Sequence, residues 1–202
     1  MEQITNYKDF LKEIDKIKEE KEKKKILIHA CCGPCSSEVL NFLKDIFDIT
    51  IYYYNPNIYP ASEYEKRYDQ FSLIPYKFDL IKGEYEEDKY YKAIEGLEDL
   101  GEFSERCYKC FYFRMEETAK KAKELGFDYF TTTLSISPYK NSKWINEIGY
   151  ELSNKYNINY LYSDFKKQEG YKKSIELSKE FGLYRQEYCG CVYSLEEKDK
   201  ND

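Results

Sequence analysis

The sequence predicts an α/β fold, a parallel five-stranded Rossmann-like sheet with helices on both faces. Two observations predict it. Short apolar runs alternate five times with amphipathic stretches after residue 25, and this alternation is typical of parallel sheets with right-handed crossovers. The 202 residues are 42% hydrophobic and 35% charged, which suits a buried core in a chain of about one domain.

The five strands are predicted, in order, from the apolar runs and the turn residues that bound them. The second ends at Asn55-Pro56, and the fourth is rich in threonine and aromatic residues. They cover residues 26–30, 49–54, 75–79, 127–133 and 158–162. Side chains at the carboxyl ends of such strands line the ligand crevice of a parallel sheet.

The helices are predicted from apolar residues at helical spacing and from capping residues. An N-terminal helix carries Phe10, Ile14 and Ile17, and a second begins at Ser36 or Ser37. The others cover residues 63–73, 88–97, 110–125, 144–156 and 171–181. We therefore expect a helical extension over 1–25, a single α/β catalytic domain over 26–194 and a disordered tail over 195–202.

Charge and hydropathy exclude several classes of protein. The 32 basic and 38 acidic residues give a net charge of −6, so a nucleic-acid site must be a local basic patch. No apolar run approaches the roughly 20 residues that span a bilayer, and the first residues carry no secretion signal. We expect a reducing, cytoplasmic location and no membrane partner.

Two groups of cysteines have the spacing of a metal site. Cys31, Cys32 and Cys35 lie in HACCGPCSS, on a strand-to-helix turn where a helix N-terminus stabilises thiolates. Cys107 and Cys110 have C-x-x-C spacing in RCYKC. Cys31, Cys32, Cys107 and Cys110 would supply four thiolates to one centre. Such a set suits a [4Fe–4S] cluster or a structural zinc, and the thiols can also carry no metal.

The third cysteine group is Cys189 and Cys191 in YCGC. A disulfide across the single Gly190 would be strained and readily reduced, which favours a redox-active pair over a structural one. The alternative is a pair of ordinary thiols. His29, the only histidine, lies in the first strand and is expected to be a core residue. A Ser/His/Asp triad and nucleotide-binding glycine loops have no matching residues.

The few arginines lie near the cysteine groups, a placement that suits a phosphate-bearing substrate. They are Arg67, Arg106, Arg114 and Arg185. Lys140 extends this candidate RNA-binding patch, and Tyr139 and Tyr171 are available for base stacking. The alternative is that the arginines pair with neighbouring glutamates.

These segments together resemble the cobalamin-independent epoxyqueuosine reductases of the QueH type. The matching stretches cover nearly all of residues 26–194: HACCGPCSS, YNPNIYPASEYEKR, RCYKCFYFRMEETA, FDYFTTTLSISPYKN and DFKKQEGYKKSIELSKEFGLYRQEYCGCVYS. The resemblance implies a HUP-like fold and an oxidoreductase. Its implied reaction is the reduction of epoxyqueuosine to queuosine in the anticodon loop of tRNA, the last step of queuosine synthesis. The implied partners are tRNAs with a GUN anticodon and an unidentified electron donor.

The resemblance also implies roles for individual residues. The family's [4Fe–4S] ligands map onto Cys31, Cys32, Cys107 and Cys110. Its redox-active pair maps onto Cys189 and Cys191. An additional iron beside the cluster maps onto Cys35 and Asp79, with Asp164 as the competing aspartate.

Two alternatives belong to other classes. An iron–sulfur tRNA thiolase would need ATP, but the chain has CCGPCSS where such enzymes carry an S-G-G-x-D-S loop. A zinc-stabilised RNA-binding module without catalysis would usually show a wider basic surface.

Overall fold

The computed structural model describes residues 4–200 and confirms the parallel five-stranded sheet. Its strands are β1 (Lys24–His29), β2 (Phe47–Tyr53), β3 (Asp79–Lys82), β4 (Tyr129–Thr132) and β5 (Asn159–Tyr160). Their order across the sheet is β3-β2-β1-β4-β5, and all four pairings are parallel. β2 and β3 follow on one side of β1, whereas β4 and β5 lie on its other side, so the strand order reverses next to β1. The connections that follow β1 and β4 therefore lead to opposite faces of the sheet, and the crevice between them is the switch point where ligands bind in such sheets.

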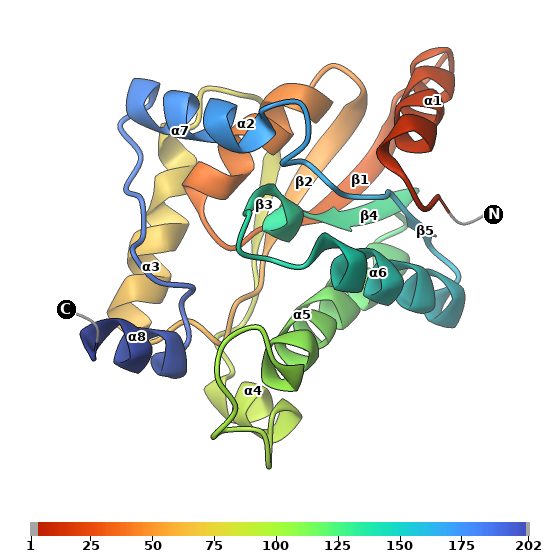
Figure 1. The fold of residues 1–202 in the computed structure, drawn as a ribbon. Coiled ribbons are helices and arrows are strands. Elements are labelled where there is room, and N and C mark those ends of the chain that lie inside the picture. The colour runs from red at the N-terminus through yellow and green to blue at the C-terminus, as the bar shows by residue number, and fades with distance from the viewer. Residues whose placement is uncertain (1–3, 201–202) are drawn as a thin grey trace.

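Helices cover both faces of this sheet (Figure 1). The face formed by Ile26 and Ile28 of β1 packs against three helices, α1 (Tyr7–Lys18), α2 (Gly33–Leu43) and α3 (Ala61–Asp69). The opposite face, with Leu27, packs against α5 (Glu105–Glu124) and α6 (Ser142–Tyr156). The alternation of β1 side chains between two apolar layers explains why this strand reads as a continuous hydrophobic run.

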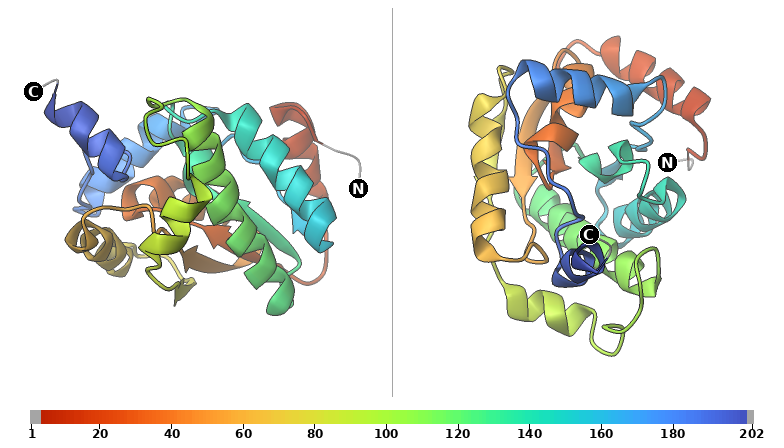
Figure 2. Two further views of the ribbon diagram at one scale, coloured as in Figure 1. Left: turned by 90° about the horizontal axis from the view of Figure 1, so that it is seen from below. Right: turned by 60° about the vertical axis from the view of Figure 1, so that its left-hand side comes forward.

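The remaining elements lie at the edges of the two layers. α7 (Gly170–Glu180) lies against α2, and α5 lies beside α6 (Figure 2). The short elements are η1 (Gln70–Leu73), α4 (Glu87–Ala93), η2 (Thr133–Ile136) and α8 (Val192–Asp199). Within residues 4–200, no helix is long and apolar enough to cross a membrane.

The N-terminal helix packs on the sheet. Its residues Phe10, Ile14 and Ile17 are buried in the same apolar layer as α2. The side chain of Asn6 caps it by accepting a hydrogen bond from the Asp9 backbone N–H. The first three residues of the predicted extension lie outside the described part of the chain.

The third strand differs from its prediction. We expected residues 75–79, but β3 covers Asp79–Lys82 and pairs Leu80 with Ile51 of β2. Pro75 has no N–H to donate to a ladder, which disfavours it within a strand. Asp79 consequently opens a strand instead of closing one.

The C-terminal residues also differ from their prediction. The last twenty residues were expected to be irregular, with a disordered tail from 195, but Val192–Asp199 forms α8. Arg106 of α5 lies 4.2 Å from the centre of the Tyr193 ring. Lys198 forms an ion pair of 2.6 Å with Glu187. These contacts hold a helix that its own sequence signals only weakly. Residues 201 and 202 lie outside the described chain.

Candidate active site

Three cysteines occupy the turn between β1 and α2. Cys32 is the N-cap of α2 with extended backbone, and Gly33 and Pro34 begin the helix. The sulfur atoms of Cys31, Cys32 and Cys35 lie within 4.8 Å of one another. Cys31 and Cys32 are buried, and Cys35 is half-buried. The turn therefore offers three converging thiols at the switch point of the sheet.

Hydrogen bonds among these thiols separate their pKa values. Bonds from Cys32 and then Cys35 lower the pKa of Cys31 well below its ordinary value, and the charges of Lys140 and Arg114 lower it further. The same bond with Cys31 raises the pKa of Cys32. Cys31 is therefore the most readily ionised of these thiols, and metal binding would have to deprotonate the others.

Cys107 and Cys110 lie on the first turns of α5. Arg114, one helical turn later, is buried and donates a hydrogen bond from Nε to the Cys110 carbonyl at 3.2 Å. Its Nη1 donates to Asn55 Oδ1 at 3.3 Å, whereas its buried Nη2 has no hydrogen-bond partner. Burial raises the pKa of Cys110 to about 11, opposed by the Arg114 charge. An unpaired guanidinium N–H beside thiols is a ready donor to an anionic sulfur centre.

His29 is a core residue, as the sequence predicted. It is fully buried, with Nδ1 at 2.9 Å from Thr132 Oγ1 and Nε2 at 3.2 Å from the Tyr54 carbonyl. Burial, followed by the Arg114 charge, lowers its pKa to about 3. The imidazole is therefore neutral and supports the loops around the switch point.

The C-terminal segment brings the third cysteine group to the same region. Cys189 is half-buried and Cys191 is buried as the N-cap of α8, and both are free thiols. Cys191 packs with Cys110 in a small apolar cluster. Gly190 has a φ of +132°, which favours glycine, and a Cβ there would lie 2.9 Å from Arg67 Nη1.

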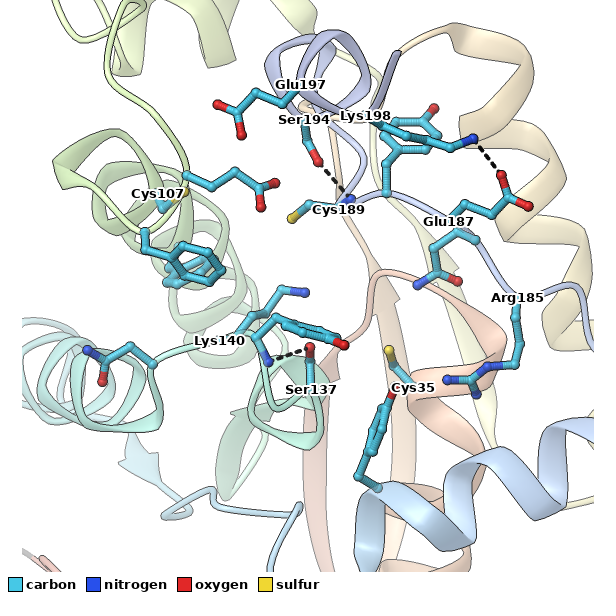
Figure 3. A pocket seen from close by; sticks show the side chains of 18 of the residues that line it. Cys35, Cys107, Ser137, Lys140, Arg185, Glu187, Cys189, Ser194, Glu197 and Lys198 are labelled. Carbon is cyan, nitrogen blue, oxygen red and sulfur yellow. Dashed lines mark hydrogen bonds and ion pairs between the residues drawn. The ribbon is translucent and has the colours of Figure 1, made fainter. Parts of the chain in front are cut away.

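One pocket of about 540 Å³ opens between the three cysteine groups. Cys35, Cys107 and Cys189 each line it, one from each group, and Figure 3 shows them on different sides of the cavity with Lys140 between them. Burial lowers the pKa of Lys140, but the nearby thiols of Cys189, Cys31 and Cys35 outweigh this and raise it, so the ammonium is retained. The cavity combines thiols with a fixed positive charge.

Three of the four arginines that were predicted to bind RNA are buried, so their side chains are not accessible to it. Arg67 has no exposed surface and pairs with Glu63 at 2.7 Å. Arg106 and Arg114 are also buried, and Arg106 lies 3.9 Å from Glu197. These side chains hold the protein together around the pocket. Arg185 alone of the four lines the cavity.

The aspartate predicted as a metal ligand is not near the cysteine turn. Asp79 is exposed at the start of β3, level with Thr50 of β2 and, through it, with Leu27 of β1. Leu27 lies in the middle of β1, and β2 separates β1 from β3, whereas the cysteines follow the carboxyl end of β1. Asp164, the competing residue, is buried after β5 and pairs with Lys166 at 2.9 Å.

Two of the pocket residues, Phe103 and Gln186, were not identified from the sequence. Phe103 lines the cavity with 58% of its surface exposed, and Tyr139, which was named from the sequence, also lines it with 70% exposed. The side-chain amide of Gln186 contacts Cys32 Sγ. Phe103 carries no motif, and Gln186 is marked only by its place three residues before Cys189.

Comparison with known proteins points to one family. The family model described as epoxyqueuosine reductase QueH matches residues 26–197. Epoxyqueuosine reductase QueH of Streptococcus pyogenes serotype M1 is 41% identical over 201 residues, covering 95% of this chain and 79% of the relative. The protein of the same description from Thermotoga maritima is 42% identical over 178 residues, covering 86% of this chain and 91% of the relative.

A solved structure shares the fold. The U34-tRNA thiolase NcsA from Methanococcus maripaludis, solved with its [4Fe–4S] cluster, superimposes with a TM-score of 0.50 at 11% identity. The match covers 94% of this chain and 70% of the thiolase. At that identity the likeness concerns the fold alone.

Proposed function

The chain belongs to the QueH family of epoxyqueuosine reductases, and we propose that it reduces epoxyqueuosine to queuosine in the anticodon loop of GUN tRNAs. It is thus an oxidoreductase, and its tRNA substrate favours a cytoplasmic location. The observation that carries the proposal is the single pocket lined by Cys35, Cys107 and Cys189. A crevice that joins thiols from three distant segments suits a redox reaction on a bound base.

We propose that Cys31, Cys32, Cys107 and Cys110 hold a [4Fe–4S] cluster. The residues present fit such a group, because the turn after β1 and the start of α5 each offer two of these free thiols. Burial lowers the pKa of Arg114, but Cys110 and Cys31 both lie near enough to this residue to raise it. The unpaired Nη2 of Arg114 and the charge of Lys140 would balance its negative charge. A cluster of this type exchanges single electrons, which is the chemistry it supplies when bound.

Cys35 is the proposed protein ligand of an additional iron. It completes the group of three converging sulfurs. Cys35 lines the pocket, whereas Cys31 and Cys32 are buried and do not line it. Asp79 is excluded from the proposed ligand set because it is exposed on the edge strand β3, two strands from β1 and level with the middle of that strand.

The proposed electron source at the site is the dithiol of Cys189 and Cys191. Conversion of an epoxide to an alkene consumes two electrons and two protons and releases water. Oxidation of two thiols to one disulfide releases two electrons and two protons, so the two half-reactions balance. An external donor of dithiol or hydride class then reduces the disulfide. Cys189 lines the pocket, and the ammonium of Lys140 offers a hydrogen-bond donor to the epoxide oxygen.

We propose that aromatic side chains, not the buried arginines, receive the RNA. Phe103 and Tyr139 are strongly exposed at the pocket, and exposed rings stack on unpaired bases. Arg185 adds a cation among the lining residues. This arrangement suits a single-stranded anticodon loop and explains how a net acidic chain accepts RNA.

A nucleoside assay tests the function. Epoxyqueuosine-containing tRNA is incubated with reconstituted protein and reductant, digested and analysed by mass spectrometry. We expect queuosine without ATP consumption. ATP consumption with a thiolated base would favour the thiolase alternative. Binding of tRNA with no conversion, by zinc-containing protein, would favour the RNA-binding module and overturn the proposal.

A further inference from the structure

Gln186 makes the contact that links the C-terminal segment to the cysteine turn. Its side-chain Nε2 donates a hydrogen bond to Cys32 Sγ at 3.1 Å. Cys32 is buried, whereas Gln186 is half-buried and lines the pocket. The two residues are 154 positions apart, so the contact depends on the tertiary fold and not on the local conformation of either segment.

The segment that carries Gln186 is fastened on both sides of it. On one side, the Tyr184 N–H donates to Gln70 Oε1 at 2.8 Å. On the other, Arg67 Nη1 donates to the Cys189 carbonyl at 3.0 Å. Both anchors come from the α3–η1 region. The Gln186 amide is therefore held in place between two fixed points.

The same region also fixes the cysteine turn. A Cβ added at Gly33 would lie 2.8 Å from the Cβ of Gln70, so the turn and η1 are in close contact at a position only glycine fits. Gln70 thus touches the turn that carries Cys32 and the segment that carries Gln186. Contacts with Gln70 therefore help to fix the distance between the Gln186 amide and the Cys32 sulfur.

A hydrogen bond to a ligand sulfur has a known electronic effect. Reduction adds negative charge to a cluster and its thiolates, so an N–H donor stabilises the reduced form more than the oxidised form. An amide donor carries no charge and does not change with pH in the working range.

We propose that Gln186 is a positioning residue that raises the reduction potential of the iron–sulfur cluster by donating to Cys32 Sγ. This inference rests on the proposed function, because it assumes that Cys32 is a cluster ligand. It gives the C-terminal segment a second task, since the stretch that carries Cys189 also touches the cluster ligand.

The experiment is a redox titration of the cluster in two variants of the full chain. Gln186→Leu removes the donor, and Gln186→Glu places a carboxylate near the sulfur in a side chain of the same length. For Gln186→Leu we expect the ratio of reduced to oxidised cluster at a fixed solution potential to fall about tenfold. This corresponds to a midpoint potential about 59 mV lower for a one-electron couple. Gln186→Glu should lower the midpoint potential further. Iron and sulfide content should match the unmodified protein.

Gln168→Glu is the matched control, because Gln168 is exposed before α7 and does not line the pocket. Its midpoint potential should be unchanged. Unchanged potentials in both Gln186 variants would overturn the proposal. Folded variants that fail to retain the cluster would also overturn it, because Gln186 would then serve assembly. An unmodified protein that binds no iron and sulfide would instead overturn the proposed function itself.

Discussion

At the scale of single residues, the site depends on side chains whose charge or reactivity is set by burial. Arg114 is held among Cys110, Cys31 and Cys189, and its Nη2 has no partner. Lys140 keeps its ammonium because thiols outweigh its desolvation. These two cations give the pocket a local positive charge inside a chain whose net charge is −6.

Cys189→Ser tests the redox pair. We expect loss of turnover when dithiothreitol is the electron source, because no disulfide can form with Cys191. The cluster absorption spectrum and iron content should persist, since Cys189 is outside the proposed ligand set. Turnover is followed by queuosine formation in tRNA, with dithionite as a control reductant that bypasses the thiols. Full turnover of the variant with dithiothreitol would contradict the relay.

Arg67→Ala tests the anchor of the C-terminal segment. The variant leaves Glu63 buried without its cation and frees the carbonyls of Tyr188 and Cys189. Breaking a buried ion pair in this way is expected to cost about 3–5 kcal/mol in the free energy of unfolding. Chemical denaturation measures the loss, and Lys12→Ala, in an exposed pair with Asp9, is the control. Equal stability of the two variants would show that the anchor is dispensable.

At the scale of elements, the sequence predicts some features well and others poorly. The central strand β1 was predicted because its side chains are apolar on both faces of the sheet and form a continuous hydrophobic run. β3 was misplaced because an apolar–polar alternation over residues 75–78 imitates a strand, and only pairing with β2 sets its register. α8 was missed because its contacts, such as that of Tyr193 with Arg106 of α5, depend on the tertiary fold.

The pairing of α5 with α6 gives a pH-dependent prediction. Burial raises the pKa of Glu116, but hydrogen bonds from Lys155 Nζ and Tyr156 OH outweigh it and lower the pKa. A lowered folded-state pKa means that this stabilisation is present above about pH 4.5 and is lost as the pH falls through the lower value.

Glu116→Gln should therefore lower the free energy of unfolding by about 0.2–1 kcal/mol at pH 7, the range for a partly exposed pair. The difference from the unmodified protein should shrink as the pH falls below 4.5. Urea denaturation at several pH values measures it. A difference that stays constant from pH 7 to pH 3 would refute the ionic contribution.

At the scale of the whole molecule, the fold brings distant segments to one pocket. The sequence predicted the three cysteine groups and placed the first of them, Cys31, Cys32 and Cys35, at the carboxyl end of a strand. It could not predict that Arg67, Arg106 and Arg114 are buried, because each of them also contacts a segment far away in the sequence. For Arg67 one partner is 122 residues away. Charged residues are usually exposed, and tertiary pairing overrides that tendency here.

The N-terminal helix belongs to this architecture. Phe10 is fully buried between α1 and the sheet, so Phe10→Ala should cost about 3–5 kcal/mol of stability. Thermal unfolding measures the change against Lys12→Ala on the exposed face of the same helix. If both variants melt at the same temperature, the helix does not contribute to the core.

The most direct test of the central claim is the iron, sulfide and zinc content of protein purified without oxygen, together with its absorption spectrum. We expect about four irons and four sulfides per chain and a brown colour that dithionite bleaches. Iron beyond four would support the additional metal at Cys35. One zinc and no sulfide, even after anaerobic reconstitution, would contradict the assignment of Cys31, Cys32, Cys107 and Cys110 to a redox cluster.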